Sequence, residues 1–420
     1  MTIPYCLTVA VARKVPSFIW AALVLRVIWL LAVDIDPVSD GFMYRDFATS
    51  IATGLGYAYP DGQLTAYWAV GASALYGLFK VLFGFSEWPI ACVNLLMGVG
   101  IVYFTFKLAL SYFDRMVATC AAWLVTVWPV LIQFTSVYAS ELVFIFFLLA
   151  ALTAWNSKIS NVALRSFLWG GLLCVATYVR PTAFPLFFVL PVLEYWTRRN
   201  LRVAFISGVI AAMTAGVLFA PWLLRNQHAF GVPVLVSANF GSNLWMGNNR
   251  YSNGGYMPLP EVTVSNEIER DQYFKNQAID YIKSNPLSYL KLSIRRVIIT
   301  YDRETIGAAW NELSLVKLVG ERGLVYIKAI STLYWWLILL AAASGIGMML
   351  FRKKSNIFHP LVVISGFFFM VPILTVGQDR YHMPLNPFLA MFAAIALDAA
   401  WKRFNSTRNS GTLPQRPKKV

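Results

Sequence analysis

Two carboxylates stand where polar segments of the sequence give way to apolar ones. Asp40 opens a helical pattern whose apolar face carries Tyr44, and it projects toward that face. Glu141 closes the polar loop 133–140 and begins a strongly apolar run. Because charge is expensive at membrane depth, acids that flank apolar helices are candidates for function. The structural alternatives are that Ser39 or Asp40 caps a helix and that Glu141 interacts with a helix dipole.

Cationic and hydrogen-bonding residues occur at comparable positions. The segment 377–384 contributes Asp379, Arg380, Tyr381 and His382 between two apolar stretches. An arginine at a membrane interface can neutralise a lipid phosphate, while tyrosine and histidine add hydrogen bonds. Arg180, followed by a proline, is a similar case. The alternatives are a snorkelling arginine that anchors a helix end and a helix-breaking turn.

Two acids and at least one cation suit a reaction in which a carboxylate activates a hydroxyl or an amine while a phosphate leaves. They also suit a lipid-binding site without chemistry. The sequence contains no Walker loop, HExxH or Gly-x-Ser-x-Gly motif, so nucleotide-dependent chemistry is unsupported. The cysteines lie in or beside apolar runs without a Cys-x-x-Cys pair, which predicts small buried hydrophobic side chains, at Cys6, Cys92, Cys120 and Cys174.

The composition predicts that these residues sit on a membrane protein. Of 420 residues, 58% are hydrophobic and only 13% are charged, whereas soluble domains are about one quarter charged. The net charge is +15. In a membrane protein basic residues report loop orientation and anionic lipid, so nucleic acid is a poor candidate partner. No cleavable signal peptide is evident, and the apolar stretch 19–33 is expected to be a retained anchor.

About 20 apolar residues span a bilayer as a helix, and ten segments qualify, some of them short. They predict an all-α integral membrane protein with about ten transmembrane helices. The segments are 16–33, 88–110, 116–134, 142–156, 166–180, 182–197, 203–222, 328–350, 357–377 and 386–401.

One further apolar stretch, 67–85, follows a Gly-rich loop and carries Lys80. If it does not cross and both termini are cytoplasmic, every short basic loop faces the cytoplasm, which is the positive-inside pattern. If it crosses, the loops from Lys107 onward face outward. We therefore expect a surface or re-entrant helix on the outer face. The basic residues concerned are Arg13, Lys14, Lys107, Arg115, Lys158, Arg165, Arg198, Arg199, Arg202, Arg352, Lys353, Lys354, Lys402, Arg403, Arg408, Arg416, Lys418 and Lys419.

This topology leaves two large outer regions, a first loop over 34–88 and a larger loop over 223–327. The larger loop begins with a turn-rich stretch and continues with helical periodicity over 266–299, broken at Asn285-Pro286. Residues 1–400 are expected to form one transmembrane domain. Residues 401–420 are expected to form a basic cytoplasmic tail.

Short motifs in this order resemble the GT-C superfamily of polyprenyl-phosphate-dependent glycosyltransferases. The nearest resemblance is to the bacterial branch related to protein O-mannosyltransferases and lipid A aminoarabinose transferases, and it extends to about residue 400. Each motif is short, but their joint order is fairly specific. The matching residues are Ser39-Asp40-Gly41-Phe42-Met43-Tyr44, Ala48, Gly54-Leu55-Gly56-Tyr57, Leu64-Thr65-Ala66-Tyr67, Leu82-Phe83-Gly84, Pro129, Ser140-Glu141, Arg180-Pro181, Arg225-Asn226, Gly231-Val232-Pro233-Val234, Gly247-Asn248-Asn249, Arg380-Tyr381, Pro384 and Pro387.

The resemblance implies roles for these residues. Asp40 would be the acid of the first outer loop, acting on the acceptor as a base or an orienting group. Glu141 would be the second-loop acid, whose role varies among relatives and can involve a metal, so a divalent cation at Asp40 and Glu141 is a candidate cofactor. Arg380, with Arg180 and Tyr381, would lie on the phosphate side. The remaining acceptor or loop candidates are Tyr44, Tyr67, Asp379 and His382.

The sequence departs from the family pattern in the first loop. Relatives often have Pro-Pro-Gly where this chain reads Trp68-Ala69-Val70-Gly71. The aminoarabinose transferases have a lysine nearby that is absent here, so their donor chemistry does not carry over. Relatives have an acid pair where this chain has Asp40-Gly41, which disfavours a two-carboxylate metal site within this loop.

Together these features predict a multi-pass glycosyltransferase of the bacterial inner membrane with a periplasmic active site. We expect an inverting transfer of one hexosyl or pentosyl unit from a polyprenyl phosphate to an envelope glycan, lipid or protein acceptor. The alternatives are a flippase of lipid-linked saccharides, a glycan polymerase or ligase, and a catalytically inactive subunit. A flippase needs ionisable groups near mid-helix. Apart from Arg26, the candidate charges lie at helix ends, which disfavours transport.

Overall fold

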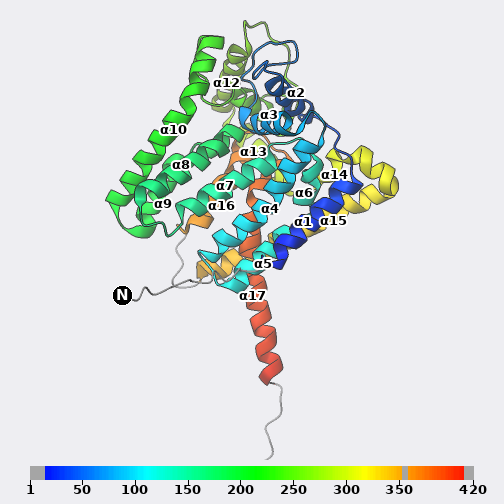
Figure 1. Ribbon diagram of the computed structural model, residues 1–420, viewed down its shortest axis with the longest axis vertical. Helices are drawn as coiled ribbons and strands as arrows, with labels where there is room; N and C mark the ends of the chain where they lie inside the picture. Colours follow the sequence, from blue (N-terminus) through cyan, green and yellow to red (C-terminus); the bar gives the residue numbers. More distant parts are fainter. Residues whose placement is uncertain (1–14, 352–357, 411–420) are drawn as a thin grey trace, which may run out of the picture.

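The computed structural model describes residues 15–351 and 358–410 (Figure 1). Within these ranges the chain is helical, and its extended pairings are two isolated bridges, between Ala58 and Leu64 and between Gly255 and Gly377. The all-α prediction is confirmed for the described ranges. Several predictions concern residues outside them, namely Cys6, Arg13, Lys14, Arg352, Lys353, Lys354 and the end of the basic tail at 411–420.

Seventeen α-helices and three short 3-10 helices make up the described part. They are α1 (Ser17–Ala32), α2 (Gly41–Ala52), α3 (Val70–Phe83), α4 (Trp88–Leu110), α5 (Arg115–Thr126), α6 (Pro129–Gln133), η1 (Phe134–Ser136), α7 (Glu141–Trp155), α8 (Val162–Val179), η2 (Pro181–Ala183), α9 (Leu186–Arg198), α10 (Leu201–Phe230), α11 (Phe240–Gly247), α12 (Glu267–Ser284), α13 (Pro286–Tyr301), α14 (Ile306–Trp310), α15 (Glu312–Phe351), α16 (Pro360–Leu374), η3 (Asp379–Leu385) and α17 (Asn386–Ser410).

All ten expected spans fall on helices, but they differ in length. Five helical stretches are long and apolar enough to cross a membrane: α4, α8, α10, α15 and the continuous stretch 379–406. A sixth is formed if α5 and α6–η1, which meet at 56°, count as one broken span. The break precedes Pro129, because a residue before proline avoids the helical region. The remaining four, α1, α7, α9 and α16, have 13 to 16 residues. A membrane protein is supported, and the number of crossings stays a prediction.

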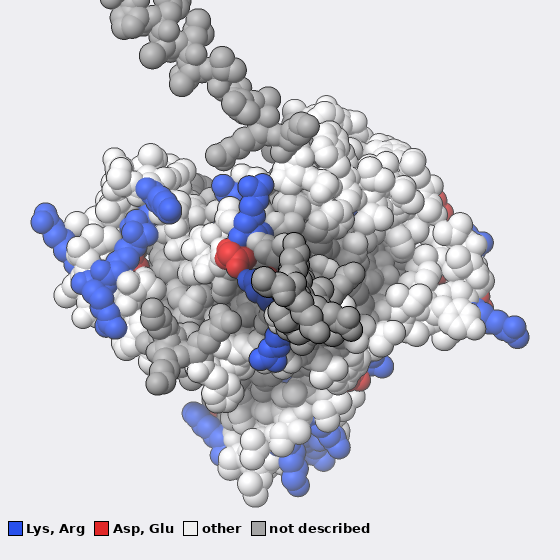
Figure 2. Space-filling view, turned by 90° about the horizontal axis from the view of Figure 1, so that it is seen from below, with Lys and Arg blue, Asp and Glu red and all other residues white. Residues whose placement is uncertain are grey.

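The turns that carry exposed cations gather at one end of the molecule. Asp114, which caps α5, lies 3.5 Å from Lys402 near the end of α17. Asn156 after α7 hydrogen bonds Ser111 at the same end. Figure 2 shows this face, from which α17 leaves the molecule, with Lys and Arg gathered on it and few acids. The exposed cations of these turns are Lys107, Arg115, Lys158, Arg198, Arg199 and Arg202. Their common position agrees with a single basic face.

One of the cations assigned to these loops is not a surface residue. Arg165 is buried, and it forms an ion pair with the buried carboxylate of Glu194. Arg198 approaches the same carboxylate at 3.2 Å. Arg165 therefore contributes to the packing of α8 against α9 and not to the basic surface.

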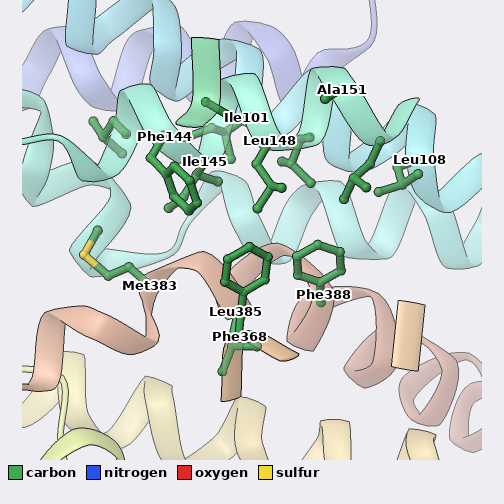
Figure 3. Close-up of a cluster of buried hydrophobic side chains, with 14 of the residues drawn as sticks. Ile101, Leu108, Phe144, Ile145, Leu148, Ala151, Phe368, Met383, Leu385 and Phe388 are labelled. Atoms are coloured by element: carbon green, nitrogen blue, oxygen red, sulfur yellow. The ribbon is translucent and has the colours of Figure 1, made fainter. Parts of the chain in front are cut away.

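The core between α7 and its neighbours positions the helix ends that lie opposite the basic face. The helix α7 is apolar on all sides, as expected for a helix that is buried all round. Figure 3 shows its side chains between α4 and the junction of η3 with α17. Glu141 begins α7, and Arg380 precedes the buried Met383 by three residues. Packing of this core therefore sets the separation of Glu141 and Arg380. The labelled residues are Ile101, Leu108, Phe144, Ile145, Leu148, Ala151, Phe368, Met383, Leu385 and Phe388.

The helices α2 and α3 form a hairpin at the same end as Glu141 and far from the basic face (Figure 1). Two glycines allow the backbones to approach. A β-carbon on Gly77 would lie 3.0 Å from the carbonyl oxygen of Ala48 in α2. A β-carbon on Gly71 would lie 2.6 Å from backbone atoms of Tyr178 and Val179 in α8. The position of α3 at this end supports the prediction of an outer-face helix over 67–85.

The expected helical part of the larger loop is present as α12 and α13, with the break at Asn285-Pro286. The turn-rich part is held against η3. Gly377 donates a backbone hydrogen bond of 2.9 Å to Gly254. The buried Arg296 of α13 donates to the carbonyls of Ile373, at 2.6 Å, and Gly247, at 2.7 Å. The segment that carries Arg380 is therefore fastened to the large loop directly before the arginine.

Candidate active site

Five of the predicted site residues lie together in the structure. They are Asp40, Glu141, Arg180, Arg380 and Tyr381, and they come from the start of α2, the start of α7, the end of α8 and η3. These segments span 340 positions of the sequence. Two carboxylates, two guanidinium groups and a phenol ring thus share one cluster at the end of the molecule opposite the basic face.

Asp40 occupies the position before α2 but does not cap it. Its carboxylate makes no capping hydrogen bond to the helix. Instead Oδ2 accepts a hydrogen bond of 2.6 Å from Nη2 of Arg380. Ser39 takes a left-handed conformation, with φ of 50°, directly before it. The capping alternative is therefore wrong for the Asp40 side chain.

Glu141 stands in the first turn of α7 with its side chain completely buried. Oε1 accepts a hydrogen bond of 2.5 Å from Nη2 of Arg180. Oε2 has no hydrogen-bond partner within the described residues, and neither has the buried hydroxyl of Tyr138. A buried oxygen left without a donor is costly, typically about 1–3 kcal/mol. Glu141 thus offers a site at which a further donor would be favourable.

Arg380 lies between the two acids. Besides the contact with Asp40, its Nη1 is 3.9 Å from Oε1 of Glu141, and its Nε donates to Gln378 at 2.7 Å. The guanidinium also lies over the rings of Trp310, at 4.8 Å, and Tyr381, at 5.4 Å. Only 8% of the residue is exposed. The snorkelling alternative is therefore wrong, because this arginine points into the protein.

Arg180 ends α8 in an extended conformation, and η2 follows at Pro181. The helix-breaking role is therefore real, and it also directs the side chain into the cluster. Nε donates to the hydroxyl of Ser140 at 2.9 Å, next to the contact with Glu141. Its guanidinium lies 5.8 Å from the ring of Tyr381. The Tyr381 ring thus lies near both arginines.

Tyr44 follows Asp40 by one turn of α2 and is buried beside the cluster. Burial, helped by the charge of Glu141, raises the pKa of Tyr44 to about 12. Its hydroxyl is therefore protonated at neutral pH and can donate a hydrogen bond.

Three of the predicted residues are not joined to this cluster. Tyr67 packs on Trp68 and lies 5.1 Å from the guanidinium of Arg270 in α12. Asp379 accepts a hydrogen bond of 3.2 Å from the hydroxyl of Thr305. His382 is buried in a second cluster, which the sequence analysis missed.

The second cluster is centred on Glu304, between α13 and α14. Its buried carboxylate accepts hydrogen bonds from Nε1 of Trp128, at 2.9 and 3.0 Å, and from Nδ2 of Asn386, at 3.1 Å. Nε2 of His382 lies 3.2 Å from Oε1. Burial raises the pKa of Glu304, and the hydrogen bonds from its neighbours act against that shift. The only sequence signal was an acid in the short polar run 302–305 between two helical segments.

The cluster does not fit a divalent cation as it is arranged. Within the described ranges no group of three His, Cys, Asp or Glu side chains is placed to hold a metal. Of the two predicted ligands, Asp40 bonds Arg380 and Glu141 bonds Arg180, with Arg380 between them. A cation there would be repelled by two guanidinium groups unless both moved away. No step is therefore assigned to a metal.

The arrangement combines a proton acceptor with two phosphate-binding side chains. A carboxylate held in one orientation can accept a proton from a hydroxyl or an amine. Buried guanidinium groups bind phosphate oxygens through paired, charge-assisted hydrogen bonds. The two functions are adjacent, because the same Arg380 contacts the acid.

Neither a protein-family model nor a curated protein sequence matches the chain. Solved structures do. The apo oligosaccharyltransferase of Archaeoglobus fulgidus aligns with a TM-score of 0.57 and 13% identity, over 96% of this chain and 52% of that chain. The oligosaccharyltransferase AglB of the same organism, in complex with an inhibitory peptide and a dolichol-phosphate, gives 0.54 and 13%, over 95% and 52%.

A weaker likeness, with a TM-score of 0.47 and 13% identity, covers 96% of this chain and 82% of ArnT from Cupriavidus metallidurans bound to undecaprenyl phosphate. The chain spans about half the length of the oligosaccharyltransferases it matches. The likeness over nearly all of this chain shows that it shares the fold of the Archaeoglobus fulgidus oligosaccharyltransferase, which agrees with the resemblance noted in its sequence.

Proposed function

We propose that the chain is a membrane glycosyltransferase that moves a sugar from a polyprenyl phosphate to an acceptor of the cell envelope. The observation that carries the proposal is the position of Arg380, 2.6 Å from Asp40 and 3.9 Å from Glu141. A buried cation between two acids is what a reaction needs when one acid takes a proton and a phosphate leaves. The shared fold supports the donor class.

In the proposed reaction Asp40 accepts the proton of the acceptor nucleophile. The freed electron pair forms a bond to the anomeric carbon, the bond from that carbon to the phosphate oxygen breaks, and the phosphate leaves with its electrons. Attack from the face opposite the phosphate inverts the anomeric centre. Arg380 and Arg180 neutralise the leaving phosphate, since each is already placed within the cluster.

When the phosphate binds, the guanidinium of Arg380 turns part of its hydrogen bonding from Asp40 to the phosphate, which frees Asp40 to act as a base. Arg180 stays paired with the buried Glu141, which orients it. Tyr44, protonated and one turn from Asp40, donates a hydrogen bond to the acceptor or the sugar.

Two alternative functions can be distinguished from the proposed one. A flippase would need ionisable groups along a path through the bilayer, whereas the clustered charges here lie at the ends of α2, α7 and α8 and in η3. A glycan polymerase or ligase would share this cluster and differ in its donor, an oligosaccharide linked through a diphosphate, and the oligosaccharyltransferase fold supports it as the second candidate.

The test is mass spectrometry of envelope glycans and glycolipids from a deletion strain complemented with wild type or with variants. Asp40→Asn removes the base and should reduce transfer by about 10²–10⁴-fold, the usual range for general-base catalysis. The matched control is Asp46→Asn on the same helix, whose carboxylate pairs with Arg45 at 3.1 Å. It should behave as wild type.

The mass lost in the deletion strain identifies the transferred unit and separates one sugar from an oligosaccharide. Full restoration by Asp40→Asn would refute the role of Asp40. Accumulation of unchanged donor on the inner side of the membrane, with transfer intact in isolated membranes, would favour a flippase.

A further inference from the structure

The helix α13 (Pro286–Tyr301) has two opposite faces. Its inner face carries the buried Leu292, Arg296 and Thr300. Its outer face carries an apolar stripe in which each side chain is more than half exposed, formed by Leu287, Leu290, Ile294 and Ile298. Spacings of three, four and four residues place these four on one side of a helix. An apolar stripe of this kind is unfavourable in water and favourable in contact with lipid.

The stripe is continuous with surfaces expected to face lipid. Tyr301, at the end of α13, stacks on Phe369 of α16 with 4.7 Å between ring centroids. The backbone carbonyl of Asp302, the next residue, accepts a hydrogen bond of 2.9 Å from Nε1 of Trp336, near the middle of the part of α15 that follows the break at Gly320. Exposed apolar side chains surround these contacts on both helices, at Leu333, Leu337, Leu340, Met370 and Leu374.

A groove of about 430 Å³ lies beside the stripe, between α12 and α13. Lys291 and Arg295, four residues apart, line it together with Tyr281, Ser288, Leu292 and Ile294. Both cations are exposed, and among the residues that the structure describes neither has an ion-pair partner. The groove therefore combines two unpaired positive charges with apolar walls.

The spacing along the helix orders the charges and the stripe. With 1.5 Å per residue, Lys291 lies about 15 Å and Arg295 about 9 Å from Tyr301, so the two cations are about one helical turn apart. Ile294 and Ile298 lie about 10 Å and about 5 Å from Tyr301, toward the end of α13 that contacts α16 and α15. An acyl chain that follows Ile294 and Ile298 toward these helices therefore leaves its phosphate beside Lys291 and Arg295.

We propose that the groove between α12 and α13 binds an anionic phospholipid. Lys291 and Arg295 hold the phosphate and headgroup, and an acyl chain lies along Ile294 and Ile298, the half of the stripe nearer to Tyr301. This site is separate from the Asp40 cluster and does not depend on the proposed reaction. Through the inner face of α13, where Arg296 holds the carbonyls of Ile373 and Gly247, the bound lipid would also steady the segment before Arg380.

The experiment uses the full chain, purified and reconstituted in nanodiscs of phosphatidylcholine with increasing phosphatidylglycerol, and bound lipid is counted by native mass spectrometry. Wild type should retain phosphatidylglycerol selectively over phosphatidylcholine. Lys291→Gln/Arg295→Gln should weaken that retention by about tenfold or more, because each cation near a headgroup contributes roughly a fivefold gain. The matched control, Lys317→Gln/Arg322→Gln, removes an exposed lysine and an exposed arginine that do not line the groove and should retain lipid as wild type does.

Further measurements distinguish which phosphate compound the groove binds. Inorganic phosphate at millimolar concentration should not displace the lipid, since it cannot occupy the stripe. Equal retention of phosphatidylglycerol by the Lys291/Arg295 variant and wild type would overturn the proposal. Preferred retention of polyprenyl monophosphate over phosphatidylglycerol would also overturn it, by assigning the groove to the carrier. If the double variant does not fold, Arg295→Gln alone gives the same test with about a fivefold effect.

Discussion

The contact between Asp40 and Arg380 allows a quantitative test of how the cluster is held together. At 2.6 Å, with the effective dielectric constant of about 20 that suits sites near a protein surface, the attraction is about 6 kcal/mol. At 3.9 Å, the attraction between Arg380 and Glu141 is about 4 kcal/mol on the same scale. Both are gross values, because removing the charges from water offsets most of the gain.

What remains after this offset is expected to be about 1.5–3 kcal/mol for Asp40 with Arg380, the range of charge-assisted hydrogen bonds. The longer contact of Arg380 with Glu141, which is not a hydrogen bond, should contribute less than about 1 kcal/mol. The perturbations are Asp40→Asn, Glu141→Gln and Arg380→Gln, combined in two double-mutant cycles that share the arginine variant. The cycles isolate the pairwise contribution from the effect of each single change.

The assay is chemical or thermal unfolding of the purified protein in one detergent, followed by intrinsic tryptophan fluorescence. The coupling energy of Asp40 with Arg380 should exceed that of Glu141 with Arg380. Additive effects of Asp40→Asn and Arg380→Gln, within about 0.5 kcal/mol, would show that the two side chains do not interact as described. A larger coupling energy between Glu141 and Arg380 would instead show that Arg380 is held mainly by Glu141.

Three further predictions concern the scaffold around the site. Burial raises the pKa of Glu304, so the folded protein binds a proton on this carboxylate more tightly than the unfolded chain does. Wild-type stability should therefore fall as pH rises above about 4.3 toward the raised pKa. Melting curves of Glu304→Gln, recorded between about pH 4 and 7, should lack this pH dependence. Arg26 is buried with Nε and Nη2 lacking partners within the described ranges, so Arg26→Met should raise the free energy of unfolding by about 1–3 kcal/mol, and a loss of stability would reveal a hidden partner. Gly71→Ala should destabilise by about 1–3 kcal/mol because its β-carbon would meet the α8 backbone at 2.6 Å, whereas Gly366→Ala, with open space around it, should be neutral or slightly stabilising in the same melts.

The sequence predicted the helices well because membrane-compatible helices need long apolar runs, and such runs are visible without a structure. Each expected span falls on a helix, and the break at Asn285-Pro286 lies where proline requires it. The lengths were predicted less well. The segment 116–134 reads as one apolar run, but the conformation forced on Trp128 by Pro129 divides it into α5 and α6.

Among the candidate site residues, five lie together in the structure, and their roles stay predictions: Asp40, Glu141, Arg180, Arg380 and Tyr381. Their signal was an ionisable side chain at the end of an apolar run, and several such ends necessarily meet at one membrane face. The same signal misled for His382. One residue on in a 3-10 helix changes the direction of a side chain by about 120°, so Tyr381 and His382 point to different clusters.

Glu304 could not be recognised from sequence because its importance lies in its partners. Trp128, His382 and Asn386 come from two distant parts of the chain, and nothing in the run 302–305 indicates that they converge on one carboxylate. The same holds for Arg165, which reads as a loop cation and is buried against Glu194. Pairing between distant helices is a property of packing, and a single sequence does not record it.

The wide separation of the cluster residues along the chain has a consequence for biosynthesis. A ribosome adds about 5–20 residues per second, so Asp40 emerges roughly 20–70 seconds before Arg380, its partner at 2.6 Å. Glu141 lacks its partner for a much shorter time, because Arg180 follows it by 39 residues. During insertion the first acid therefore lacks this partner until late in synthesis. Arg380 lies in the last apolar hairpin, between α16 and α17, so a nascent chain that stops before residue 380 cannot assemble the complete cluster.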